Sequence, residues 1–235
     1  SIVQKQFENR LVGKTYLAKV HGHPSEDKMS CEASLAREAG EGGIYLIAAH
    51  PHWRESRVNR RMFAAASGLP GATTLDLYGR YPDYHIDVQA EQARVEAARL
   101  VVLLHPIQWY ATPPLQKLWF DEVLTWGWAY GTDGNALRGK DLWLAVTTGG
   151  PQDSYQPGSY NRYVFDAFLP PYEQTAALCG MRFAPPLVLH GAHTASEAAV
   201  AAHVDQFVQR LQSYPDWPEL NHLPDCATCE VPPDA

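Results

Sequence analysis

LVVLLHPIQWYATPPLQKLWF, residues 100–120, is the stretch that decides the fold. Its first five residues are apolar without polar alternation, which predicts a short strand buried on both faces of a sheet. Pro113 and Pro114 then predict the first turn of a helix, in which Leu115, Leu118 and Trp119 share one face. The polar and aromatic residues between them therefore form a strand-to-helix loop, and in an open parallel sheet such loops line the crevice where ligands bind.

The same alternation of strand and helix runs through the chain from residue 44 onward. We expect strands over residues 44–49, 73–78, 100–104, 142–147 and 181–190. We expect helices over residues 58–67, 88–98, 114–126, 163–179 and 195–213. This pattern predicts an α/β fold, a flavodoxin-like three-layer sandwich whose five-stranded parallel sheet has the order 2-1-3-4-5. Pro185 and Pro186 place the last strand near an edge or at a bulge.

The two ends of the chain differ in composition from this region. Residues 1–43 contain scattered charges and no sustained periodicity, so we interpret them as an N-terminal extension. Residues 44–213 form the predicted domain, and residues 214–235 form a C-terminal tail rich in proline. Neither end predicts a second domain, because 235 residues suit one sizeable core.

Composition excludes several classes of function. The net charge is −7 and charged residues make up only 19% of the chain without a basic run, which argues against nucleic-acid binding. The apolar runs are shorter than the roughly 18–20 residues that span a bilayer, and the first residues lack the apolar core of a secretory signal. Four cysteines fit a reducing compartment, so we expect a cytoplasmic protein.

No metal site is predicted. The candidate ligands are Cys226 and Cys229 with His222 in the tail, and two pairs of histidines, His50 with His52 and His190 with His193. The tail offers three ligands where a structural zinc site usually has four, and neither histidine pair has a carboxylate at a matching spacing.

The loops after the first, third and fourth strands should meet at one edge of the sheet, because the strand order reverses beside the first strand. The first of these loops, residues 50–59, contains hydroxyl, amide and backbone N–H groups and leads into the N-terminus of a helix. This combination of groups favours binding of a phosphate. Its candidate ligands include His50, Ser56 and Asn59. The alternative is that Ser56 only caps the helix and Asn59 is a solvated residue of its first turn.

The other two loops suit a flat ligand. Their candidate residues are Pro106, Ile107, Gln108, Trp109 and Tyr110 after the third strand, and Thr147, Thr148, Gly149 and Gly150 after the fourth. The first set offers amides and aromatic side chains that would flank a ring, and the second offers hydroxyls and glycines that let a ligand approach the backbone. The alternatives are plain aromatic packing and a common glycine turn.

Spacing of glycines discriminates between cofactors. The dinucleotide fingerprint G-x-G-x-x-G is absent after the first strand, and the phosphate-binding loop G-x-x-x-x-G-K-[ST] is absent from the chain. A flavin therefore fits better than a resident dinucleotide or nucleoside triphosphate. The segment of residues 126–131, WGWAYG, either packs in the core or covers a pocket, and we interpret Trp128 and Tyr130 as walls of a substrate pocket.

Five motifs together carry a family resemblance. They are His50 and Pro51 with Ser56 and Asn59, YPD at residues 81–83 with Ile86 and Asp87, HPIQWY at residues 105–110 with Pro114, Leu115, Lys117 and Trp119, GWAYG at residues 127–131, and TTGG at residues 147–150. In these motifs residues 44–212 resemble the flavodoxin-like NAD(P)H:quinone oxidoreductases, and most closely the ancillary subunits of bacterial glutathione-regulated potassium-efflux systems.

The resemblance implies a two-electron flavin enzyme that passes a hydride from NAD(P)H through flavin N5 to a quinone, and we favour FMN over FAD. It implies that His50, Ser56, Val58 and Asn59 hold the phosphate and ribityl end of the flavin. Pro106–Tyr110 and Thr147–Gly150 would surround its ring. The family often places a tyrosine and a histidine beyond the second of these loops to stabilise charge on the ring. Tyr155 matches the tyrosine, and no residue of the following segment matches the histidine.

The resemblance also implies partners. Members are usually homodimers, and the ancillary subunits bind a potassium-efflux membrane protein, which would place the protein peripherally at the inner face of the cell membrane. Two alternatives to the enzyme follow. One is a regulatory subunit that activates such a membrane protein, with flavin mainly structural. The other is an electron-carrying flavodoxin, against which the aromatic loop and the extra length after Gly150 argue.

Overall fold

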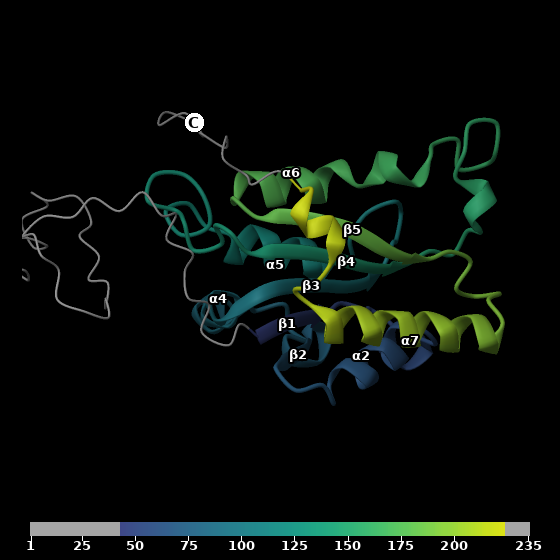
Figure 1. Cartoon of the computed structure of the whole chain (residues 1–235), viewed down its shortest axis with the longest axis horizontal. Helices are drawn as coiled ribbons and strands as arrows, with labels where there is room; N and C mark the ends of the chain where they lie inside the picture. Colours follow the sequence, from purple (N-terminus) through teal and green to yellow (C-terminus); the bar gives the residue numbers. More distant parts are fainter. Residues whose placement is uncertain (1–42, 224–235) are drawn as a thin grey trace, which may run out of the picture. The chain divides into compact units, whose positions relative to one another are not determined.

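The computed structural model describes residues 43–223 and contains a five-stranded parallel sheet in the order β2-β1-β3-β4-β5 (Figure 1). The strands are β1 (Gly43–Ala48), β2 (Ala72–Asp76), β3 (Ala98–Pro106), β4 (Asp141–Thr147) and β5 (Arg182–Leu189). The predicted fold class and strand order are confirmed. β3 is longer than expected and includes His105 and Pro106, which the sequence had suggested belong to the loop.

Helices cover both faces of the sheet, because alternate residues of each buried strand point to opposite sides. They are α2 (Asn59–Ala66) and α7 (Glu197–Ser213) on one face, and α4 (Val88–Ala97), α5 (Pro114–Val123) and α6 (Pro170–Leu178) on the other (Figure 1). In β1, Tyr45 and Ile47 pack with the second group of helices, and Leu46 and Ala48 pack with the first.

Parallel pairing brings the ends of three strands together. Ala48 of β1 pairs with Leu104 of β3, and Leu104 pairs with Ala145 of β4. Pro106 and Thr147, the last residues of β3 and β4, also pair. The loops that follow β1, β3 and β4 therefore leave the sheet at the same edge, as the strand order predicts.

Local side-chain chemistry explains where the elements differ from expectation. The second strand ends at Asp76, because its carboxylate accepts a hydrogen bond from Gly79 N (3.1 Å) and begins the short helix α3 (Leu77–Arg80). The helix expected from residue 163 begins only at Pro170, since proline suits a first helical turn and not an interior. The residues before it form η3 (Phe165–Phe168), a short 3-10 helix.

β5 is an edge strand and carries a bulge, which confirms the interpretation of its two prolines. Trp143 pairs with Ala184 and Ala145 pairs with Leu187, so that Pro185 and Pro186 lie opposite a single residue of β4. The indole nitrogen of Trp143 donates to Pro185 O (3.1 Å) and fixes this bulge from the neighbouring strand.

The packed part of the domain continues past residue 213. Trp217 is 2% exposed and packs between the indole of Trp143 and the guanidinium of Arg210, which lies 4.0 Å from its ring centre. The short helix η4 (Pro218–Asn221) follows it. The expected extension up to residue 42, and Cys226 and Cys229, lie outside the described residues. Within the described part of the chain, no helix is long and apolar enough to cross a membrane and no cluster of metal ligands occurs.

One buried carboxylate organises the face covered by α4 and α5. Glu91 is fully buried and accepts hydrogen bonds from Tyr45 Oη (2.6 Å), Tyr81 Oη (2.7 Å), Trp119 Nε1 (2.9 Å) and Arg94 Nη1 (2.6 Å). Four donors compensate the desolvation of this charge, so the network links β1, α4 and α5.

Candidate functional site

The first loop carries a buried amide that connects it to the third. Asn59 is 2% exposed, and its Oδ1 accepts a hydrogen bond from Thr147 Oγ1 (3.0 Å). The interpretation of Asn59 as a solvated residue is therefore wrong. Ser56 is also buried, and its Oγ accepts from Arg60 N (3.2 Å) in the first turn of α2, although Val58 and not Ser56 is the capping residue of this helix.

The other half of the Asn59 amide has no protein partner. Its Nδ2 is buried without a hydrogen bond, which is costly for an amide donor unless a ligand or water accepts from it. This donor lies at the N-terminus of α2, where Val58 is the capping residue and makes no side-chain hydrogen bond. An unused donor beside a helix N-terminus fits the phosphate or hydroxyl oxygens of a flavin tail.

The second loop is a tight turn in a strained conformation. Gln108 and Ala111 exchange two hydrogen bonds (3.0 Å each), and Trp109 and Tyr110 between them have positive φ angles of 50° and 64°. This is a turn with two left-handed central positions, which aromatic residues rarely occupy. Strain of this kind concentrates at ligand sites.

The two aromatic side chains of this turn have different surroundings. Tyr110 stacks on Phe168 (5.0 Å between ring centres), and its hydroxyl donates to Asn161 Oδ1 (3.2 Å), so plain packing explains it. Trp109 is 94% exposed and packs on nothing in the described chain. The turn is nevertheless tied to the third loop, because Ile107 N donates to Thr147 O (2.8 Å).

The third loop presents an open stretch of backbone. Thr147 and Thr148 are buried, whereas Gly149 is exposed. A Cβ added to Gly149 would meet only His193, at an ordinary 3.5 Å, so this glycine leaves space for a ligand rather than for a protein neighbour. At Gly150 a Cβ would lie 2.8 Å from Ser154 Oγ, so a larger residue would displace this hydroxyl and its hydrogen bond with Asn161.

Tyr155 lies beside a histidine that the sequence did not reveal. Its ring centre is 5.2 Å from that of His190, and burial raises the pKa of Tyr155 while a contact with the Thr148 hydroxyl opposes the rise. His190 follows the last residue of β5, and burial lowers its pKa. No residue of the segment that directly follows Tyr155 matches this histidine, because His190 reaches the site from a distant part of the sequence. Once β5 is recognised as the neighbour of β4, with Leu189 paired to Thr147, the residue after it falls at the site.

Trp128 and Tyr130 do not lie with the three loops. Trp128 Nε1 donates to Glu96 Oε1 (2.7 Å), near the C-terminal end of α4 where β3 begins. The reason is the direction of α5, which starts at the ends of the strands and runs back to their beginnings, so the loop after it lies at the opposite edge of the sheet, on the left in Figure 1. Within one chain they cannot line the predicted pocket.

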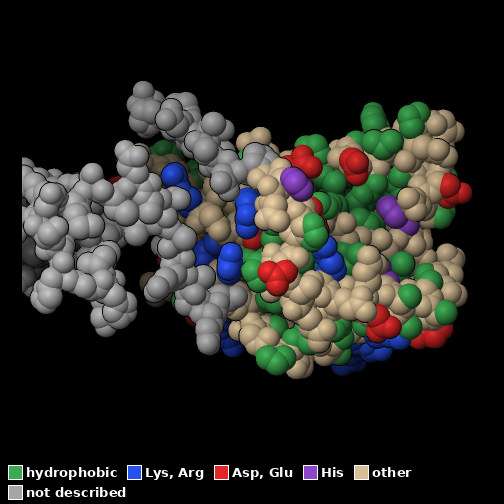
Figure 2. Space-filling model, in the orientation of Figure 1, with side chains coloured by type: hydrophobic (Ala, Val, Ile, Leu, Met, Phe, Trp, Pro, Cys, Tyr) green, Lys and Arg blue, Asp and Glu red, His purple; other side chains and the backbone are tan. Residues whose placement is uncertain are grey.

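Exposed hydrophobic side chains surround the site. Besides Trp109, the segment before η3 exposes Tyr160 (70%), Tyr163 (63%) and Val164 (50%). In the space-filling view, hydrophobic side chains are exposed at the end of the sheet that carries these loops (Figure 2). Large exposed side chains gathered in one region are typical of an interaction surface.

A doubly wound parallel sheet with three linked loops at its strand ends defines a flavodoxin-like protein. Residues 43–213 of this chain match a protein family that is described as having the flavodoxin-like fold. The chain belongs to the flavodoxin-like NAD(P)H:quinone oxidoreductase family, close to the KefF proteins. It is 44% identical over 179 residues to the glutathione-regulated potassium-efflux system ancillary protein KefF of Citrobacter koseri, a match that covers 76% of this chain and 99% of the relative.

Two solved structures support the family assignment. General stress protein 14 of Treponema denticola, solved in complex with FMN, is 36% identical with a TM-score of 0.66, and the match covers 74% of this chain and 98% of the other. A protein described as an NADPH-quinone reductase from P. pentosaceus is 26% identical with a TM-score of 0.64, covering 72% of this chain and 97% of the other.

Proposed function

We propose that the protein is an FMN-dependent oxidoreductase that uses NAD(P)H to reduce quinones by two electrons. The observation that carries this proposal is the junction of the three loops: Thr147 accepts from Ile107 N and donates to Asn59, and the Asn59 amide keeps a buried unused donor. FMN is preferred to FAD because the relative from Treponema denticola was solved with FMN.

Each loop has a separate task in this proposal. The N-terminus of α2, with His50, Ser56, Val58 and Asn59, would hold the phosphate and ribityl end. The backbone of residues 106–110 and 147–150 would surround the ring and hydrogen-bond its edge. A bound flavin would supply the redox chemistry, accepting a hydride from NAD(P)H and delivering it to the acceptor.

Tyr155 and His190 would form the hydrogen bonds to the acceptor oxygen that gains a proton during the reduction. Because burial raises the pKa of Tyr155, its hydroxyl keeps its hydrogen at neutral pH and can donate a hydrogen bond to a carbonyl oxygen. Burial lowers the pKa of His190, so its imidazole is neutral and can accept a hydrogen bond. The pair therefore stabilises a developing hydroxyl group on the acceptor without introducing a fixed charge.

In a homodimer, the three loops of one chain and the predicted pocket residues Trp128 and Tyr130 of the other would form one site. Trp128 and Tyr130 lie at the opposite edge of the sheet from the three loops, so they can line a substrate pocket only if a second copy of the chain supplies them. The exposed side chains of Trp109, Tyr160 and Tyr163 provide a surface beside the site on which a second copy would pack.

The decisive experiment is the absorbance spectrum of the purified protein, with the mass of the released cofactor and NAD(P)H oxidation followed with and without menadione. Gly149→Val should lose flavin and activity, because its side chain enters the space beside the ring. Gly68→Val is the matched control, since Gly68 is also exposed with room for a Cβ but lies at the end of α2 away from the loops. A colourless protein that cannot be reconstituted with FMN overturns the proposal.

A second candidate is a regulatory subunit that binds and activates a potassium-efflux membrane protein, peripherally at the inner face of the membrane, with flavin mainly structural. The name of the Citrobacter koseri relative favours it. Trp109→Ala separates the two functions, because this exposed side chain can be removed without disturbing the core. If quinone reduction is lost while potassium efflux through the partner is still activated, the regulatory function stands on its own.

A further inference from the structure

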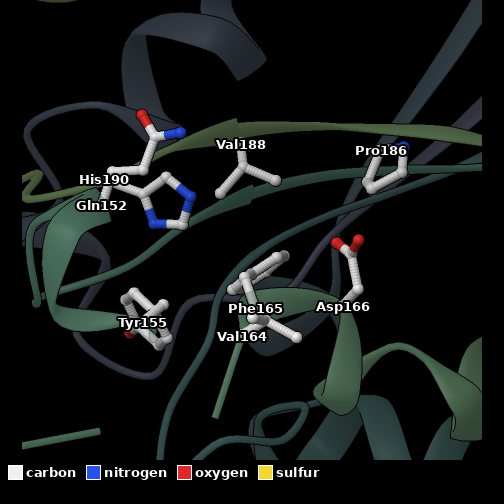
Figure 3. A pocket seen from close by; sticks show the side chains of 8 residues that line it. All are labelled: Gln152, Tyr155, Val164, Phe165, Asp166, Pro186, Val188 and His190. Carbon is white, nitrogen blue, oxygen red and sulfur yellow. The ribbon is translucent and has the colours of Figure 1, made fainter. Parts of the chain in front are cut away.

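A cavity of about 380 Å³ lies against the outer strand of the sheet, next to the third loop (Figure 3). One wall is formed by Pro186 and Val188, which share one face of β5 because side chains alternate along a strand, and by His190 directly after the strand. Tyr155 and Phe165 lie opposite and contact the imidazole of His190, with ring centres 5.2 and 5.1 Å apart, so they close the cavity at that end. We call this cavity the β5 slot. Beside this contact, the apolar surface of Pro186, Val188 and Phe165 suits an aromatic ring, and the volume is at the small end of the range for ligand pockets.

One end of the slot is polar and uncharged. Because Thr148 Oγ1 donates to Gly150 O (2.8 Å), its contact with His190 Nδ1 (3.0 Å) is satisfied when the imidazole is the donor. A neutral His190 then has Nε2 free as an acceptor, and Figure 3 shows its ring pointing along the slot. Gln152 and the hydroxyl of Tyr155 add donors at this end. The combination suits a carbonyl or carboxamide group.

The other end carries a negative charge. Asp166 lies at the far end from His190, and its carboxylate points toward the slot in Figure 3. No ion pair engages Asp166 within residues 43–223. An unpaired carboxylate beside apolar walls favours a ligand that brings a cation or a hydrogen-bond donor to this end.

We propose that the β5 slot binds an aromatic compound with a carbonyl or amide group at one end and a cationic group at the other, and that Asp166 selects the cationic end. The inference rests on the proposed function in one respect: the compound bound here would be the electron acceptor, so the slot would determine which acceptors are reduced. Binding itself requires no turnover and is tested separately.

The test measures binding of two matched probes to the purified full-length protein by isothermal titration at low ionic strength. The probes are 4-(aminomethyl)benzamide, a cation, and 4-methylbenzamide, its neutral analogue. The wild type should bind the cation about threefold more tightly, as expected for one exposed charge pair. Asp166→Asn should remove the preference and leave binding of the neutral probe unchanged. Asp153→Asn, at an exposed carboxylate outside the slot, should keep the preference.

A charge reversal strengthens the test. Asp166→Lys should favour the anionic analogue 4-carbamoylbenzoate over 4-(aminomethyl)benzamide. Equal binding of the cationic and neutral probes to the wild type, a preference that survives in Asp166→Asn, or no binding of either probe overturns the assignment of the slot. Since Asp166 is exposed, these substitutions should not disturb folding, which a thermal melt of each variant verifies.

Failure of the slot assignment and failure of the proposed function would give different results. If the protein reduces quinones but shows no Asp166-dependent preference among probes or among amine-bearing and neutral quinones, the slot assignment is wrong and the proposed function stands. If the probes bind as expected but no flavin or quinone reduction is found, the slot exists and the proposed function is wrong.

Discussion

We predict that His105 makes the stability of the fold depend on pH. It is fully buried on β3, its Nδ1 hydrogen donates to Pro106 O (2.9 Å), and its Nε2 has no partner. Its ring stacks on Tyr172 (5.9 Å between centres). Burial lowers the pKa of His105 to about 4, because a second proton would place an uncompensated charge in the core.

The size and sign of the effect follow from this pKa. In the unfolded chain the imidazole has a pKa near 6.5, so the unfolded state binds the proton first as pH falls, and stability decreases below that value. Between about pH 7 and about pH 5, His105 alone should lower the free energy of unfolding by about 2 kcal/mol. The loss ends near the folded-state pKa, where both states carry the proton.

The assay is urea unfolding of the wild type and of His105→Phe at these two pH values, with equal protein and cofactor concentrations and a check that the slopes agree. The variant keeps an aromatic ring against Tyr172 but cannot be protonated, so its loss of stability on acidification should be smaller by about 2 kcal/mol. Tyr172→Phe is the control: it removes only an unpartnered hydroxyl and should retain the wild-type pH dependence. If His105→Phe loses as much stability as the wild type, the assignment of this pH dependence to His105 is refuted.

Four further substitutions test the packing and the site. Trp217→Ala should lower the free energy of unfolding by about 3–5 kcal/mol in chemical denaturation, because a buried indole leaves a cavity, while Trp109→Ala should change it by less than about 0.5 kcal/mol. Glu91→Gln should cost about 3 kcal/mol, measured in the same way, since an amide cannot accept from all four donors around it; an unchanged midpoint would mean that the network contributes little. Asn59→Ala should weaken FMN binding about tenfold in fluorescence titration by removing the buried donor, and unaltered affinity would show that Nδ2 does not face the ligand.

The fold could be predicted because short stretches of the sequence carry the evidence for each strand and helix. Continuous apolar runs predicted buried parallel strands, and Pro185 and Pro186 predicted an edge with a bulge. Local chemistry also explains the errors in boundaries: Asp76 begins a turn by accepting from Gly79, and a pair of prolines fixes the start of α6.

The site was predictable only where residues are close in sequence. The burial of Asn59 depends on Thr147, 88 residues away, and His190 reaches Tyr155 because β5 pairs with β4. Neither relation leaves a local pattern. The position of Trp128 could have been inferred, because a helix that begins at the ends of parallel strands must return to their beginnings. The left-handed conformation of Trp109 and Tyr110 could not, since such turns ordinarily use glycine or asparagine.

The bulge at Pro185 and Pro186 also affects how copies of this protein meet. A proline has no backbone N–H, so the outer rim of the sheet offers an interrupted row of donors to any strand that approaches it. Edge-to-edge aggregation is therefore discouraged along an otherwise apolar strand. The same interruption keeps the rim beside the β5 slot unpaired, which leaves open the route by which the proposed ligand would enter.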